Sequence, residues 1–161
     1  MLQTLLKDRF QLQIRPEEKT LSAYALSVAK GGPKLKASAL TEKECLETPD
    51  ACHAWSGGQG RGIHTKGMDM ADLAVFLEQY SDRPIVDATG LKGLYEIDTE
   101  GWVPLIGRVG PVSDTPEGRA LGDSARPTLA MVLDKLGLKL ESTKAPIKTY
   151  AIEHVERPSA N

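Results

Sequence analysis

The chain has 161 residues, of which 40% are hydrophobic and 26% charged, and its formal net charge is −2. This length and composition predict one soluble folded domain that needs no metal or disulfide to fold. Basic and acidic residues are interspersed, and without a basic stripe we exclude nucleic acid as a partner. No apolar run approaches the ~18 residues of a membrane span, and the N-terminal residues lack the order of a signal peptide.

The first periodic segment predicts a helix followed by two strands. Apolar residues between positions 2 and 10 recur at the spacing of a helix with one buried stripe. Alternating residues then predict strands over 11–14 and 20–28, with a turn at 16–19 between them.

The second periodic segment repeats this order. Asp69 is the expected N-cap of a helix over residues 70–80, because its carboxylate can accept from the first free backbone N–H groups. Short strands are expected at 84–87 and 94–98.

A third segment has Pro127 in the first turn of a helix, followed by strands at 138–141 and 147–155. The sequence therefore predicts one α+β domain over residues 1–161, built from repeated helix–strand–strand units with helices packed on largely antiparallel sheets. The units lie at about 1–30, 68–100 and 124–157, with long loops at about 31–67 and 101–123.

Asp87 raises the question of a catalytic carboxylate, because it lies between an apolar run and two glycines. An Asp at the end of a strand accepts hydrogen bonds from the backbone two residues on, and Gly90 and Gly93 allow sharp bending. We therefore predict a structural corner at this position.

The loop predicted at 31–67 contains the glycine cluster 57–62, which follows Ser56. A phosphate-binding loop would follow a strand and continue into Gly-Lys-Ser/Thr, and neither feature is present. We predict that the cluster is a flexible loop. Long connections in compact domains are functional or mobile, so a site is first sought here.

Histidines and acidic residues of the 45–72 region are the candidate catalytic side chains. His53, His64, Asp69 and Asp72 offer imidazole and carboxylate groups, with His53 and His64 as the candidate metal ligands. Their spacing matches no C-x-x-C or H-E-x-x-H device, and the chain has no Gly-x-Ser-x-Gly elbow. We predict no cofactor.

Cys45 and Cys52 are the two cysteines of the chain. If oxidised they close a small loop, and if reduced they are two ordinary thiols. The residues alone leave both states open.

Blocks at both ends and in the middle of the chain carry a family resemblance: Met1–Phe10, Tyr24–Leu26 with Ala29–Leu35, Arg83–Tyr95 and Ile152–Asn161. Together they resemble an uncharacterised family of exported proteins, a domain of unknown function expanded in acidobacterial soil genomes. Its members begin with a signal peptide and a further N-terminal region, and this chain resembles their C-terminal two thirds, begun at an internal methionine. The resemblance implies a periplasmic or secreted location, where Cys45 and Cys52 could pair, and supplies no catalytic residues.

Two functions stay open, and with them the question of whether the chain is an enzyme. We favour a non-catalytic envelope or secreted module that binds an unknown protein or small molecule, because no catalytic constellation is recognisable. The alternative is a small promiscuous hydrolase, metal-assisted, with its site in the 45–72 region. Exposed strand edges also favour a homodimer.

Overall fold

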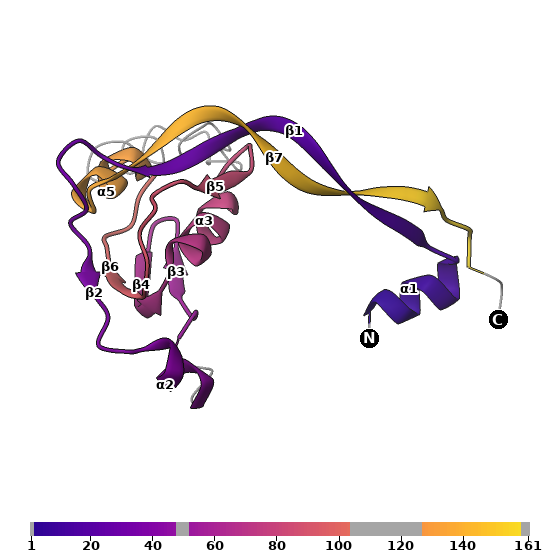
Figure 1. Cartoon of the computed structure of the whole chain (residues 1–161), viewed down its shortest axis with the longest axis horizontal. Helices are drawn as coiled ribbons and strands as arrows, with labels where there is room; N and C mark the ends of the chain where they lie inside the picture. The colour runs from indigo at the N-terminus through magenta and orange to yellow at the C-terminus, as the bar shows by residue number, and fades with distance from the viewer. Residues whose placement is uncertain (1, 48–51, 104–126, 159–161) are drawn as a thin grey trace, which may run out of the picture. The chain divides into compact units, whose positions relative to one another are not determined.

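The computed structural model describes residues 2–47, 52–103 and 127–158 (Figure 1). Within these ranges the chain forms helices and mixed or antiparallel sheets, which confirms the α+β class. The helices are α1 (Leu2–Phe10), α2 (Glu42–Glu47), α3 (Met70–Glu78) and α5 (Leu129–Lys135). The strands are β1 (Gln13–Val28), β2 (Lys36–Ala37), β3 (Ser56–Gly58), β4 (Gly62–Met68), β5 (Ile85–Asp87), β6 (Tyr95–Asp98) and β7 (Leu138–His154).

The chain divides into two compact units, where the sequence predicted one domain. The larger unit is Ala23–Thr143, and the smaller one combines Met1–Ser22 with Lys144–Asn161. The long strands β1 and β7 each contribute residues to both units. None of the described helices is long and apolar enough to cross a membrane.

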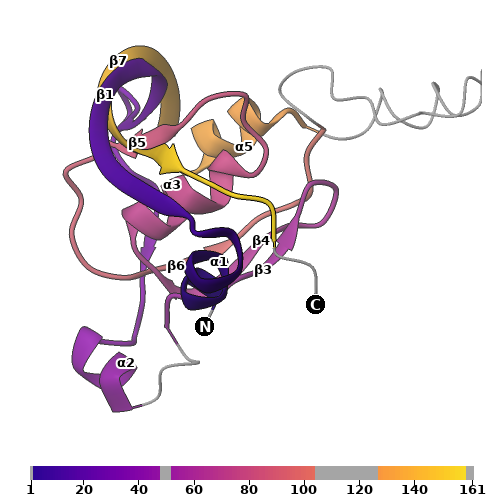
Figure 2. The ribbon, with the colours of Figure 1, turned by 90° about the vertical axis from the view of Figure 1, so that its right-hand side faces the viewer.

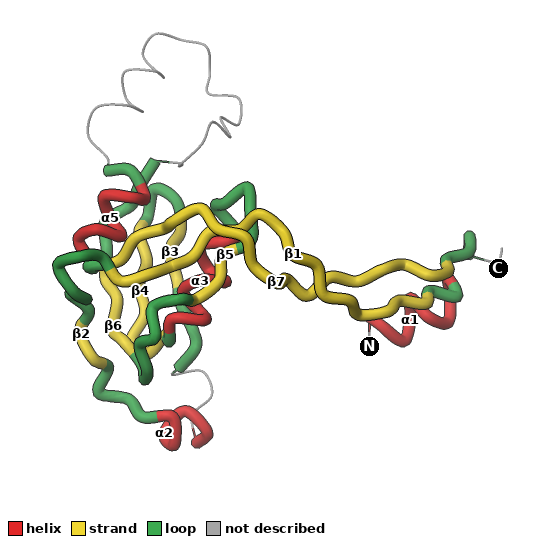
Figure 3. Tube along the Cα trace, turned by 45° about the horizontal axis from the view of Figure 1, so that its top comes forward, coloured by secondary structure: helices red, strands yellow, loops and turns green. Residues whose placement is uncertain are grey.

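The larger unit contains two sheets. In the first, the order is β5-β1-β7, and β5 runs parallel to β1 with Tyr24 opposite Ile85. The second has the order β2-β6-β4-β3 and is antiparallel throughout (Figure 3). One hydrophobic core takes side chains from both sheets and from α3 and α5.

Helix α3 supplies the largest share of this core. The prediction that Asp69 caps it is confirmed, because its Oδ1 accepts a hydrogen bond from the backbone N–H of Asp72 at 2.7 Å. Phe76 is 2% exposed and meets three aromatic rings, whereas Val75, one residue earlier, faces solvent. The aromatic neighbours of Phe76 are Trp55, Tyr80 and Trp102.

The segment predicted as a long loop at 31–67 contains β2, α2, β3 and most of β4, so this prediction is wrong. The glycine cluster in it is not a flexible loop either. It forms the β3–β4 hairpin, visible in Figure 2, in which Gly57 faces Ile63. A Cβ on Gly57 would lie 2.1 Å from the carbonyl oxygen of Gly62, so glycine is required here for close backbone packing.

The predicted corner at Asp87 is confirmed. Its Oδ1 accepts hydrogen bonds from the backbone N–H of Thr89 at 2.9 Å and from the Thr89 hydroxyl at 2.7 Å. Gly90 and Gly93 have φ values of 68° and 88°. The carboxylate therefore stabilises the turn that leaves β5.

The smaller unit consists of α1 and the outer parts of β1 and β7. Arg15 Nε donates to Glu153 Oε1 at 2.8 Å, and the Thr149 hydroxyl donates to the Glu17 carbonyl at 3.3 Å. Later positions in β1 thus meet earlier positions in β7, so the two strands run antiparallel. The turn predicted at 16–19 is wrong, because β1 continues through Pro16. The break predicted before residue 147 is likewise absent from β7, which passes through Pro146. Prolines are tolerated in edge strands, where no ladder donor is required.

The predicted threefold repeat is not confirmed. In the first and third segments the helix is followed by one long strand in place of two. The second has both predicted strands, but β5 and β6 belong to different sheets. Most of the loop predicted at 101–123 lies outside the described residues.

Candidate functional site

The outer face of the second sheet carries a polar surface. Along β4, Ile63 and Thr65 are buried while His64 and Lys66 are exposed, as expected for a strand with one face in the core. His64 faces Ser56 on one side and Asp98 on the other. Residues from three strands therefore align in one row across this face.

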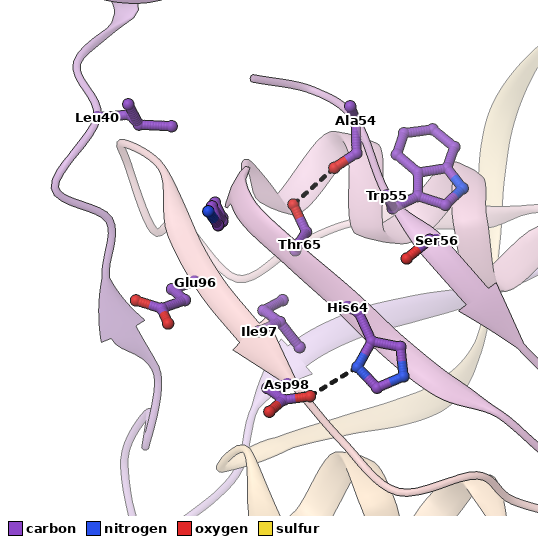
Figure 4. Close-up of a pocket in the computed structure, with 10 residues that line it drawn as sticks. Leu40, Ala54, Trp55, Ser56, His64, Thr65, Glu96, Ile97 and Asp98 are labelled. Atoms are coloured by element: carbon purple, nitrogen blue, oxygen red, sulfur yellow. Dashed lines mark hydrogen bonds and ion pairs between the residues drawn. The ribbon is translucent and has the colours of Figure 1, made fainter. Parts of the chain in front are cut away.

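An open groove of about 870 Å³ lies over this polar surface (Figure 4). Strands β3, β4 and β6 form most of its lining, and Leu40 stands at the opposite side from Trp55. The lining residues are Leu40, Ala54, Trp55, Ser56, His64, Thr65, Lys66, Glu96, Ile97 and Asp98.

His64 is held by hydrogen bonds at both ring nitrogens. Nε2 lies 2.8 Å from the carbonyl oxygen of Arg61, and Nδ1 lies 2.6 Å from Oδ1 of Asp98. A carbonyl and a carboxylate both only accept, so the imidazolium, with a proton on each nitrogen, satisfies both contacts. The Arg61 carbonyl and, second, the Asp98 carboxylate raise the pKa of His64 above its ordinary value of 6.5.

The row of Ser56, His64 and Asp98 has the residue types of a catalytic triad but not its hydrogen bonds. A triad needs a histidine nitrogen that accepts from the serine hydroxyl. Here Nε2 is used by the Arg61 carbonyl, and within the described residues no hydrogen bond joins Ser56 to His64. His64 therefore does not activate Ser56 in this geometry.

A second polar cluster lies at the N-terminus of α3. Nδ1 of His53 is 2.5 Å from Oδ2 of Asp72, and one ligand atom each from His53, Asp69 and Asp72 lie within 4.8 Å of one another. Three of the four predicted site residues are thus brought together. Among the described residues, His64 is not part of this group.

The cysteines are joined by a disulfide, which decides between the two states that the sequence left open. Cys45 and Cys52 have an S–S distance of 2.08 Å, and both are buried next to Leu94. Neither is available as a thiolate ligand or nucleophile.

Sequence reasoning missed three residues of the groove. Asp98 and Ser56 reach His64 only through strand pairing, and Lys66 carries no local signal that distinguishes it from the other lysines of the chain. The alternation of Ile63 and Thr65 with the more polar His64 and Lys66 is the sequence signal that favours a strand here.

A family model described as "Protein of unknown function (DUF3738)" matches residues 1–155. The chain belongs to this family. The match confirms the resemblance to a domain of unknown function, and export and bacterial origin stay predictions. No curated protein and no solved structure matches the chain. For this DUF3738 domain, any statement about function therefore depends on the geometry above.

Proposed function

We propose that the chain is a non-catalytic binding module of the bacterial envelope or of secreted proteins, and that the groove over β3, β4 and β6 is its binding surface. The observation that carries the proposal is the convergence of polar side chains from three strands on one open groove. The engagement of both His64 nitrogens favours binding over catalysis. The Cys45–Cys52 disulfide supports a location outside the reducing cytosol.

The charges of the groove favour an acidic ligand. Glu96 is paired with Lys36 at 2.6 Å, and Asp98 is paired with His64. Within the described residues, the ammonium group of Lys66 has no hydrogen-bond or ion-pair partner. A ligand carboxylate next to Lys66 would therefore form an ion pair with the one charged group of the groove lining that has no partner among the residues that the structure describes.

A titration followed by amide NMR with a short oligo-glutamate peptide tests this proposal. We expect shifts at Ser56, His64 and Lys66, and an affinity loss of about tenfold in Lys66→Glu, because the charge reversal repels the peptide. Lys92→Glu makes the same charge change outside the groove lining and is expected to leave the affinity unchanged. Equal binding of oligo-lysine, or equal losses in the two variants, would contradict the proposal.

A hydrolase is the second candidate function, and the cluster at the N-terminus of α3 is the observation that favours it. An imidazole with two carboxylates is a ligand set that suits a divalent cation such as Zn²⁺. His53, Asp69 and Asp72 would hold the ion, which would supply an activated water for hydrolysis when bound. In the structure the same groups also stabilise the fold, since Asp69 caps α3 and Asp72 pairs with His53.

Elemental analysis and Zn²⁺ titration calorimetry, together with a fluorogenic ester panel, test whether the chain is a metal-dependent hydrolase. It predicts stoichiometric Zn²⁺ and chelator-sensitive turnover, both lost in His53→Ala and in Asp72→Asn. Asp82→Asn removes an exposed carboxylate outside the cluster and should change neither. If the native chain binds no stoichiometric metal and turns over no ester, the hydrolase is ruled out and the binding module is retained.

A further inference from the structure

Among the described residues, the smaller unit carries most of the large apolar side chains that are exposed. Ala145 is the one buried side chain among those described in this unit. Two-stranded ribbons without a covered apolar face are marginally stable in water. Of the eight exposed large hydrophobic residues in the described ranges, six belong to this unit: Leu5, Ile14, Leu21, Tyr150, Ile152 and Val155.

In this unit the outer edges of β1 and β7 differ in how well they are protected from pairing with another strand. In the described residues, β7 is an edge strand, and β1 pairs with β5 only in the larger unit. The β1 part is protected by Pro16 and by a run of charges over residues 15–19. By contrast, the β7 segment 147–152 has Lys148 as its single charge. The β7 edge is therefore the one open to another strand.

We propose that β7 of the smaller unit pairs antiparallel with β7 of a second copy of the chain, with Ala151 on the two-fold axis. The pattern of side chains around Ala151 is what points to a second copy. Tyr150 and Ile152 lie two residues apart and therefore share a face of the ribbon, and they are 68% and 66% exposed. With Ala151 on the axis, each Tyr150 lies opposite the partner's Ile152.

This register places compatible side chains opposite each other at several positions on both sides of the two-fold axis. Aromatic residues opposite β-branched ones are among the favourable cross-strand pairs, and the two-fold axis makes this pair twice. Thr149 lies opposite the partner's Glu153, so the carboxylates do not face each other. The small side chain of Ala151 allows the two strands to meet at the axis. The inference is independent of the groove, which lies in the larger unit.

Sedimentation equilibrium of the whole chain tests the pairing. We expect a monomer–dimer equilibrium that Ile152→Lys shifts to monomer, because each dimer would then place two charges at apolar contacts. Ile152 is exposed, so the melting temperature of the monomer should not fall. Met131→Lys makes the same kind of change at a residue 55% exposed in the larger unit and should leave the dimer intact. A native chain that stays monomeric, or a dimer that survives Ile152→Lys, overturns the proposal.

Cysteine cross-linking tests the register. Both native cysteines are in a disulfide, so an introduced thiol is the single free one. At the axis, Ala151→Cys places two Cα atoms about 5 Å apart, within the range of a disulfide, and should give a covalent dimer on oxidation. Lys148→Cys would place them about 20 Å apart and should not cross-link. Efficient cross-linking of Lys148→Cys, or none of Ala151→Cys, would overturn the proposed register.

Discussion

Gly62→Ala is expected to lower the free energy of unfolding of the larger unit by about 4 kcal/mol. Gly62 has a φ of +94°, where side chains are strained, and a Cβ would lie 1.9 Å from the carbonyl oxygen of Thr99. That oxygen belongs to backbone, which cannot move aside as a flexible side chain could. The alanine would therefore push β4 away from the segment that follows β6.

The matched control for this variant is Gly90→Ala. Gly90 also has a positive φ, +68°, but no atom lies within 4 Å of the position of a Cβ. It should cost about 1 kcal/mol, from backbone strain alone. Urea unfolding followed by tryptophan fluorescence measures the free energy of unfolding of both variants. Equal losses in the two variants would show that the close approach at Gly62 is wrong.

The same contact connects the hairpin to the groove. The backbone N–H of Ile63, next to Gly62, donates to the hydroxyl of Thr99 at 2.9 Å, and Thr99 N–H donates back to the Ile63 carbonyl at 3.0 Å. His64 and Asp98 are the next residues along these two strands. Glycine at position 62 thus places the His64 side chain opposite its carboxylate partner.

Local signals in the sequence were sufficient for α1, α3 and α5 and for the corner at Asp87, but α2 was missed. Asp69 precedes an apolar stripe at helical spacing, and the cap and stripe both act within a few residues. Local signals also led to the wrong prediction of a turn at residues 16–19. Pro16 with its charged neighbours is typical of a turn, but pairing with β7, more than a hundred residues away, keeps this segment extended.

In the candidate site, too, local signals place some residues, and only strand pairing places the others. Asp69 and Asp72 lie three residues apart at a helix start, so their proximity follows from the predicted helix. The partner of His64 is Asp98, 34 residues further along the chain, and it is brought there by the register of β4 against β6. Register depends on which strands pair and where bulges fall, and neither can be read from one sequence without the fold.

Phe76→Ala is expected to lower the free energy of unfolding of the larger unit by about 4 kcal/mol, the range for a buried Phe truncated to Ala. The ring centroid of Phe76 lies 5.4 Å from Tyr80, 6.0 Å from Trp55 and 6.1 Å from Trp102. These neighbours come from separate segments, so they cannot close around the cavity together.

Val75→Ala, at the adjacent position of the same helix, is the matched control. Val75 is 56% exposed, and its truncation should change the unfolding free energy by less than about 0.5 kcal/mol. Similar losses in the two variants would contradict the burial pattern of α3.

Trp55 packs against Phe76 and also lines the groove, so Phe76→Ala should in addition weaken oligo-glutamate binding under conditions where the variant is still folded. A folded Phe76→Ala variant with unchanged affinity would show that Trp55 takes no part in binding.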